Sequence, residues 1–281
     1  MLYQISNGTV SVGGELILSH IHFEIRGNEK IAVVGKNGAG KTTTISLLST
    51  LLLPTKGEIL IDGQQLTRQR PDLKRKISVI TQEYSMRQDM NMDEIMEYQG
   101  RLYFMPRKQI KERTEELLEF CDLLKFRKRT VRKLSGGMKR KLMVCRALLT
   151  DPEILLLDEP TAGMDALSRR QMWNLLRKLN EKNLTILLTT HYMEEAQSLC
   201  NRVALMDHGK LEEVSTPSAL IESLGAYAVD EMTADGTQNH YFHTRQEAIR
   251  YLEELTGQAS LRETTLEDVF VERAGKHLIS K

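Results

Sequence analysis

A glycine-rich loop near the start of the chain limits the fold more than any other feature. The β-rich run at residues 30–35, KIAVVG, leads into Gly35-x-x-x-x-Gly40-Lys41-Thr42, and a helical pattern begins at Gly40. Glycines let backbone N–H groups curl around phosphate oxygens, and the positive end of the following helix points at the same oxygens. The order of strand, loop and helix therefore predicts a phosphate-binding loop rather than an ordinary glycine turn.

The same loop carries the charged and hydroxyl groups that a nucleoside triphosphate needs. Lys41 can place a positive charge between the β- and γ-phosphates, and the Thr42 hydroxyl is suited to bind Mg²⁺. Lys36 adds further positive charge beside the first glycine. The predicted nucleotide-binding residues are Gly35, Lys36, Asn37, Gly38, Ala39, Gly40, Lys41, Thr42 and Thr43.

An aliphatic run at residues 153–160, EILLLDEP, ends in two acids, Asp158 and Glu159. In parallel sheets, ligands lie outside the carboxyl ends of the strands, so these acids should lie near the phosphates. We expect Asp158 to orient Mg²⁺ through water and Glu159 to polarise the attacking water as a general base. The alternative is a helix-capping aspartate beside a surface glutamate, but the aliphatic run and Pro160 favour catalysis.

Strand and helix patterns alternate, which predicts an α/β fold with a mainly parallel sheet. Short strands with turns at 7–8 and 13–14 are expected first, and further strands at 57–63, 76–82, 153–158 and 184–191. A helix from Gly40 to Pro54 would bury Ile45, Leu47, Leu48, Leu51 and Leu52. Residues 86–140 carry many charges at helical spacing and predict a helical subdomain inserted into the sheet.

The pattern changes after about residue 217. A polar hairpin is expected at 226–244, a helix at 245–255 and a capped helix at 264–275. Thr264 or Thr265 could cap that last helix, with Glu267 or Asp268 three residues further on. His240 and His243 lie in the hairpin, where two histidines without other ligands favour surface positions over a metal site.

Composition excludes several other classes of protein. The formal net charge is +1, so no overall field attracts nucleic acid, and no nucleic-acid partner is expected. The three cysteines lie far apart and indicate buried residues in a reducing compartment. No secretory signal is visible, and the longest apolar stretch, 45–53, is far shorter than the roughly 20 residues of a membrane span. Work at a membrane would therefore need a partner.

A second phosphate-binding sequence, LSGGMKRK, stands at residues 134–141. Together with the phosphate loop and the acidic strand end, it closely resembles the ATP-binding cassette (ABC) ATPase family over roughly residues 1–220. The resemblance implies an α/β P-loop NTPase fold with N-terminal antiparallel strands and a helical subdomain at about 86–140. Residues 221–281 would form a small C-terminal accessory region.

The resemblance also implies roles for further residues. Two cassettes of the family pack head to tail around two ATP molecules, so Ser135, Gly136 and Gly137 would face the ATP of a second, identical or different, subunit. Gln82 would contact Mg²⁺ or the attacking water, and Asp165 would cross the dimer interface. His191 would bind the γ-phosphate and align Glu159 with the water. ATP and Mg²⁺ are the implied cofactors.

LSGGM, in place of LSGGQ, and TLEDVF at 265–270 resemble the drug-resistance and polysaccharide or lipid exporter branch. In that branch a separate transmembrane permease is the second polypeptide, which implies an ATPase peripheral to the cytoplasmic face of the membrane. A groove after Gln82 would receive the permease, and we hypothesise that Tyr84, Met86 and Met90 line it. The alternative is that these residues pack in the core.

Two departures from common patterns affect the nucleotide site. Val12 stands where the family usually stacks an aromatic ring on adenine, which predicts weaker or less base-selective binding unless Tyr3 or another ring substitutes. Residues 125–141 contain nine Lys or Arg and no acid, which indicates either a solvated face or a positive field for phosphates or lipid headgroups.

The sequence also bears on three functions other than that of a transport ATPase. A DNA-repair ATPase of the family would carry a long coiled coil between the phosphate loop and LSGGM, and this interval is short. A ribosome-associated protein usually carries two cassettes, and this chain has one. A module that holds ATP without hydrolysis is disfavoured because Glu159 and His191 are both present.

Overall fold

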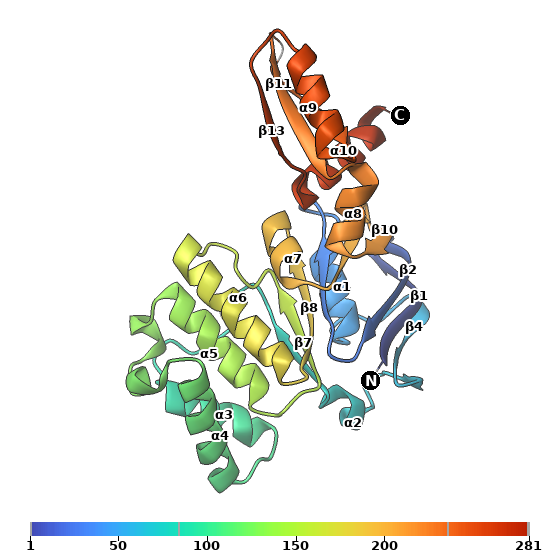
Figure 1. Ribbon diagram of the computed structural model, residues 1–281. Helices are drawn as coiled ribbons and strands as arrows, with labels where there is room; N and C mark the ends of the chain where they lie inside the picture. Colours follow the sequence, from blue (N-terminus) through green and yellow to red (C-terminus); the bar gives the residue numbers. More distant parts are fainter. Residues whose placement is uncertain (1, 84, 235, 280–281) are drawn as a thin grey trace.

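The centre of the protein is a six-stranded sheet (Figure 1). The structure is a computed structural model that describes residues 2–83, 85–234 and 236–279. In spatial order the strands are β10 (Lys210–Ser215), β9 (Arg202–Asp207), β3 (Lys30–Val34), β8 (Thr185–Thr190), β7 (Ile154–Asp158) and β6 (Ile77–Ile80). Only the edge strand β10 is antiparallel to its neighbour. The mainly parallel sheet predicted from the sequence is thus confirmed.

The central strands are continuously aliphatic because both faces of the sheet are covered. Along β7, Leu155 and Leu157 join one core cluster, whereas Ile154 and Leu156 join another. Successive side chains of a strand point to opposite faces, so a strand buried on both faces needs apolar residues throughout. The first cluster includes helices α5 (Gly136–Leu148), α6 (Ala166–Glu181) and α7 (Met193–Leu199), and the second includes α1 (Lys41–Leu48).

An antiparallel sheet from the N-terminal part of the chain covers α1 on its other side. Its strands, in spatial order, are β2 (Glu15–Arg26), β1 (Leu2–Val12), β4 (Lys56–Ile61) and β5 (Gln64–Gln65). The turn expected at residues 13–14 joins β1 to β2. The turn expected at 7–8 is wrong, because Asn7 and Gly8 form an irregularity within β1, where the register with β2 and β4 shifts.

Helix α1 is shorter than its sequence pattern predicts. It ends at Leu48, and Thr50 adopts a left-handed conformation with φ of 60°, which stops the helix before Pro54. Ile45, Leu47 and Leu48 are buried as expected, but Leu51 is 60% exposed. The apolar face of the helix therefore holds one turn fewer than the leucine run implies.

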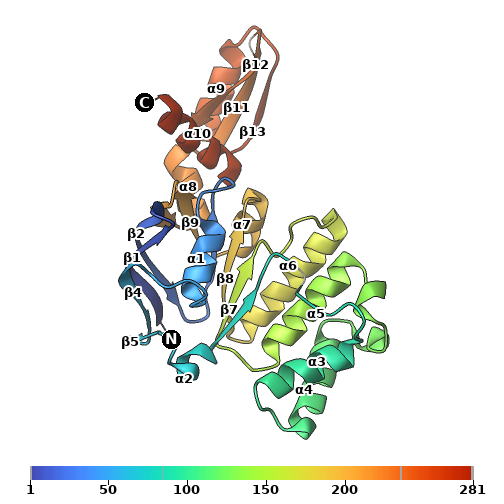
Figure 2. The ribbon, with the colours of Figure 1, turned by 180° about the vertical axis from the view of Figure 1, so that it is seen from behind.

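Helices fill most of the interval between β6 and β7. They are α3 (Met92–Leu102), α4 (Arg107–Phe120), η1 (Leu124–Phe126), η2 (Val131–Lys133) and α5, while the short α2 (Pro71–Lys74) precedes β6. A capping box fixes the start of α3, because the Asn91 side chain accepts from the Glu94 N–H and the Glu94 side chain accepts from the Asn91 N–H. The helices between β6 and β7 lie together beside the main sheet in Figures 1 and 2.

The C-terminal part forms a small lobe beyond β10 (Figures 1 and 2). After α8 (Pro217–Leu224) come β11 (Tyr227–Thr233), β12 (Gly236–Phe242), α9 (Arg245–Glu254), β13 (Ala259–Glu263) and α10 (Leu266–Ile279). The strands make an antiparallel sheet in the order β12-β11-β13, so the expected hairpin is present. A domain boundary near residue 220 remains a prediction.

Helix α10 ties this lobe to the main body. Leu266 and Val269, within TLEDVF, are buried in the core cluster that contains α5, α6 and α7. The Asp268 carboxylate accepts from the Thr265 N–H at 2.8 Å and pairs with Arg262, so Thr265 and Asp268 are the residues that fix the first turn. Of all the helices in the described ranges, none has the length and apolarity to cross a membrane.

Candidate nucleotide site

Backbone carbonyls of the glycine loop bind the side chain of Lys41. Gly40 precedes α1 with φ of 106°, and a Cβ there would lie 2.7 Å from the Leu18 side chain. Lys41 is 6% exposed, and its Nζ donates to the carbonyls of Gly35 at 2.9 Å and Lys36 at 3.1 Å. Burial lowers the pKa of Lys41, while Glu159 and Asp158 act in the opposite direction. The ammonium is therefore held at the centre of the loop.

The surroundings of Lys41 fit a triphosphate and a divalent cation. Lys36, Asn37 and Gly38 form the exposed rim of the loop, and Gly38 has φ of 83° with open space where a Cβ would lie. Thr42 is exposed in the first turn of α1. Phosphate requires hydrogen-bond donors, which the backbone N–H groups and Lys41 supply. Mg²⁺ requires oxygen ligands, and the Thr42 hydroxyl is one.

Thr189 of β8 holds the two acids at the end of β7, Asp158 as its last residue and Glu159 directly after it. The Asp158 side chain is 4% exposed, and its Oδ1 accepts from the Thr189 hydroxyl at 2.5 Å. The Glu159 N–H donates to the Thr189 carbonyl and hydroxyl, both at 3.1 Å. Sequence reasoning missed Thr189, although its position two residues before His191 is a signal that could have found it.

The Glu159 carboxylate lies between Lys41 and His191. Its Oε1 is 3.8 Å from Lys41 Nζ, and its Oε2 is 3.1 Å from His191 Nδ1. Lys41 is the first residue of α1, and Glu159 and His191 directly follow β7 and β8, so the carboxyl edge of the sheet brings the three together. The Lys41 ammonium and the His191 imidazole therefore lie on either side of the Glu159 carboxylate, which can act as a base there.

The LSGGM residues lie elsewhere, beside Asp165. Ser135 caps α5, its Oγ accepting from the Met138 N–H at 3.3 Å. Gly137 approaches Ser168, since a Cβ at Gly137 would lie 3.3 Å from the Ser168 hydroxyl. Asp165 accepts from the N–H and the hydroxyl of Ser168, and these bonds lower the pKa of Asp165. Ser135 and Gly137 line a hollow together with Ser168, Met138 and Lys141.

Gln82 follows β6 on the surface, and its backbone is tied to α5. Its carbonyl lies 3.4 Å from Arg140 Nη1, and the preceding Thr81 carbonyl accepts from the same atom at 2.7 Å. Arg140 is 2% exposed, although the sequence suggested a run of surface charge. Two other residues of the 125–141 run pair with acids from outside it, Arg127 with Asp93 and Lys141 with Asp122. Part of the run is therefore buried or paired, and a positive field for phosphates or lipid headgroups stays a prediction.

The hypothesis for the permease groove needs correction. Met86 is 7% exposed and belongs to the core, Met90 packs against the core, and Tyr84 lies outside the described residues. The core-packing alternative is therefore right for Met86, whereas Met90 is half-buried against the core. A separate hollow of about 450 Å³, the α2–α3 groove, is lined by Arg68, Lys74, Arg75, Leu102, Tyr103, Phe104 and Arg146. Phe104 is 89% exposed.

No aromatic ring from Tyr3 is available to stack on adenine. Tyr3 is 1% exposed, and its hydroxyl donates to the Leu48 carbonyl within the core. Val12 lies 54% exposed at the β1–β2 turn.

His240 contacts Glu231 Oε2 at 3.0 Å and Tyr251, and the described residues contain no group of three or more His, Cys, Asp or Glu suited to a metal ion.

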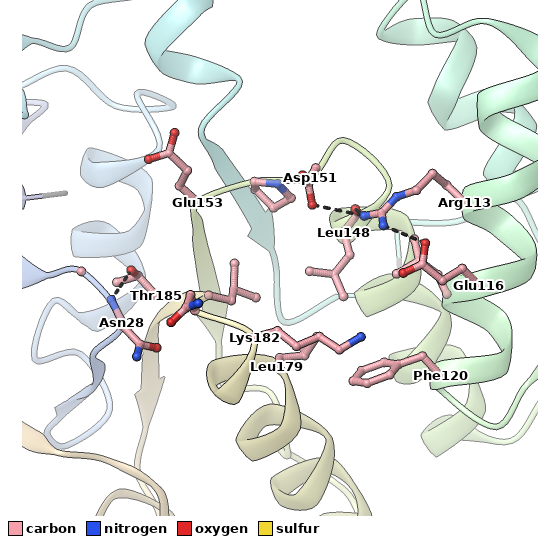
Figure 3. A pocket seen from close by; sticks show the side chains of 15 residues that line it. Asn28, Arg113, Glu116, Phe120, Leu148, Asp151, Glu153, Leu179, Lys182 and Thr185 are labelled. Atoms are coloured by element: carbon pink, nitrogen blue, oxygen red, sulfur yellow. Dashed lines mark hydrogen bonds and ion pairs between the residues drawn. The ribbon is translucent and has the colours of Figure 1, made fainter.

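The pocket in Figure 3, about 480 Å³, lies at the opposite edge of the sheet. Asn28 precedes β3, Glu153 precedes β7 and Thr185 begins β8, so this edge is the amino end of the parallel strands. Arg113 on its wall is already paired with Glu116 and Asp151. The pocket is therefore separate from the nucleotide site.

Comparison with known proteins agrees with this geometry. The family model described as "ABC transporter" matches residues 18–162, just over half of the chain. The Nod factor export ATP-binding protein I of Cupriavidus metallidurans is 32% identical over 99% of this chain and 98% of its own length. The linearmycin resistance ATP-binding protein LnrL of Bacillus subtilis is 33% identical over 84% of this chain and 76% of its own length.

Among solved structures, an ATP-binding cassette that forms a dimer in a post-hydrolysis state with ADP and Pi superimposes with a TM-score of 0.67. It is 26% identical, and the match covers 76% of this chain and 98% of that one. The chain therefore belongs to the ABC transporter family. It is an ATP-binding and ATP-hydrolysing subunit, and the relatives confirm the exporter branch that LSGGM and TLEDVF indicate.

Proposed function

We propose that this chain is one of two ATPase subunits that enclose two ATP molecules and drive a separate permease. The position of Glu159, 3.8 Å from Lys41 and 3.1 Å from His191, carries the assignment of the hydrolytic centre. Ser135 lines a different hollow, so a second subunit is the natural source of the ATP that it contacts. The partner subunit is either a second copy or a different cassette.

The residues of this chain divide the chemistry among them. Lys41 and the loop N–H groups hold the phosphates, while Thr42, Asp158 and Gln82 would hold Mg²⁺, which supplies charge neutralisation when bound. Glu159 accepts a proton from the attacking water as general base. His191 uses Nδ1 toward Glu159, so its Nε2 remains to face the γ-phosphate. This division explains why three elements converge at one edge of the sheet.

Across the dimer, Ser135 would act on the ATP of the other subunit. The Ser135 hydroxyl and the N–H groups of Gly136 and Gly137 stand at the start of α5, where the helix dipole favours a phosphate. Asp165 lies beside them through Ser168 and would cross the same interface. Closing on ATP would therefore create contacts that are absent when the subunits are apart.

The cargo is inferred from the relatives, whose names refer to Nod factor export and to resistance to linearmycin and daunorubicin. We therefore infer export of a drug, lipid or other small molecule by a permease, with this chain at the cytoplasmic face of the membrane. The α2–α3 groove is our candidate contact for the permease, because it combines exposed aromatic and apolar side chains with four cationic ones.

The groove assignment is tested by charge reversal. The four cationic side chains of the groove suit an acidic segment of the permease. Arg75→Glu would repel such a segment and is expected to lower the amount of permease that co-purifies with the tagged chain about tenfold. The matched control is Lys108→Glu on α4, whose side chain is 88% exposed and lies outside the groove. Equal recovery of the permease with both variants, at unchanged melting temperature, would remove the groove from the proposal.

Val12→Tyr is expected to tighten ATP binding. A ring at this exposed turn can stack on adenine, and base–aromatic stacking is worth about 1–3 kcal/mol, or roughly five- to 150-fold in Kd. The measurement is a titration of the full chain with ATP, with Val12→Leu as the aliphatic control. Tripolyphosphate has no base, so its Kd should not change; an equal gain for tripolyphosphate would show that stacking is not the cause.

A further inference from the structure

Arg140 links the two catalytic segments from inside the protein. It lies in the second turn of α5 and is 2% exposed. Its Nη2 donates to the Glu159 carbonyl at 2.7 Å, and its Nε donates to the Pro160 carbonyl at 2.9 Å. One edge of the guanidinium therefore grips the chain directly after β7.

The rest of the guanidinium reaches the segment after β6. Nη1 donates to the Thr81 carbonyl at 2.7 Å and lies 3.4 Å from the Gln82 carbonyl. A planar guanidinium can donate in several fixed directions at once, which a lysine ammonium on a flexible stem cannot reproduce. Arg140 thereby sets the distance between the backbone of Gln82 and that of Glu159.

The backbone that Arg140 holds at Glu159 is unusual. Glu159 has φ of 45°, a left-handed conformation that is unfavourable for a residue with a Cβ. Its N–H is fixed by Thr189 of β8 and its carbonyl by Arg140 of α5. Such a conformation persists only where neighbours enforce it, so the aim of the carboxylate toward Lys41 and His191 depends on both supports.

Arg140 also belongs to the helix that starts at the LSGGM serine. Ser135 lies five residues earlier, about 7.5 Å along the axis at 1.5 Å per residue. We propose that Arg140 is a positioning residue that couples the place of Ser135 to the aim of Glu159 and Gln82. This proposal rests on the hydrolytic and dimer roles proposed for those residues. Docking of Ser135 on the partner's ATP would then align the general base of the same chain.

The experiment measures ATP hydrolysis and ATP affinity of the full chain, alone or with its permease, for Arg140→Lys. The lysine keeps the charge but serves only one of the two segments at a time. We expect kcat to fall about tenfold, equivalent to about 1.4 kcal/mol, with KM and the Kd for ATP changed less than about threefold. Arg140→Gln, which keeps fewer donors and no charge, should be slower still.

The matched control is Arg113→Lys. Arg113 also donates to a backbone carbonyl of another element, that of Leu148 at 3.2 Å, but it lies at the opposite edge of the sheet (Figure 3). It should leave kcat per folded molecule unchanged. Because Ser135 is proposed to act on Glu159 through Arg140, the effects of Ser135→Ala and Arg140→Lys on kcat should be less than multiplicative, whereas those of Ser135→Ala and Arg113→Lys should multiply.

Wild-type kcat per folded molecule in Arg140→Lys would overturn the coupling proposal. So would a loss of kcat that only follows the loss of folded protein in both Arg140 variants, because Arg140 would then be structural. Glu159→Gln, measured in parallel, distinguishes failure of the proposed catalytic roles from failure of the coupling by Arg140. Turnover by Glu159→Gln would contradict the catalytic assignment itself, whereas an inactive Glu159→Gln beside a normal Arg140→Lys would contradict only the coupling.

Discussion

Glu159→Gln is expected to abolish ATP turnover while leaving a chain that dimerises when ATP is added. The amide has the size of the carboxylate and keeps its place between Lys41 and His191, but it cannot accept the proton of the attacking water. Loss of a general base costs about 10²- to 10⁴-fold in rate. ATP would therefore stay bound and hold the two subunits together, which light scattering with and without ATP can detect.

The control for this substitution is Glu153→Gln. Glu153 directly precedes β7, pairs with Lys76 at 3.1 Å and lines the remote pocket, so the same chemical change there should preserve turnover. Addition of Ser135→Arg to Glu159→Gln should remove the ATP-dependent dimer. A Glu159→Gln chain that still hydrolyses ATP at the wild-type rate would place the general base elsewhere.

The features that the sequence predicted well depend on local geometry. The phosphate loop requires glycines at fixed spacing, and a strand buried on both faces requires aliphatic residues, so both are visible as short patterns. His191 and Glu159 follow such strands directly, and their meeting at one edge of the sheet follows from the parallel order. The roles of Glu159 and His191 in hydrolysis come from the family resemblance, and substituting these residues is the test of those roles.

What the sequence could not show depends on side chains from distant segments. Glu195 lies in MEEAQ, where a glutamate on a surface helix is the simple expectation. In the structure it is fully buried, accepts from Thr161 Oγ1 at 2.9 Å and Trp173 Nε1 at 3.0 Å, and burial raises its pKa. Arg140 was hidden in a run of basic residues for the same reason, because its partners are backbone carbonyls that no sequence motif records.

Mixing two inactive variants is expected to restore activity if the partner is a second copy of this chain. Lys41→Ala removes the phosphate-binding cation, and Ser135→Arg places a bulky charge where the partner's ATP would lie. In a mixed dimer, the Lys41 of one chain meets the intact Ser135 of the other, so one complete site is rebuilt. If equal amounts of the two variants pair at random, half of the dimers are mixed and each has one good site, so about a quarter of the wild-type number of sites should return.

The control mixture combines Lys41→Ala with Glu159→Gln. Both lesions affect the same half of the composite site, in which Lys41 and Glu159 are 3.8 Å apart, so each site of the mixed dimer keeps one lesion and activity should stay absent. If Ser135 served the ATP of its own chain, the first mixture would remain inactive as well. Recovery in the first mixture and none in the second is therefore the pattern that only an ATP shared between two chains produces, and it would assign LSGGM and the phosphate loop to opposite sides of one nucleotide.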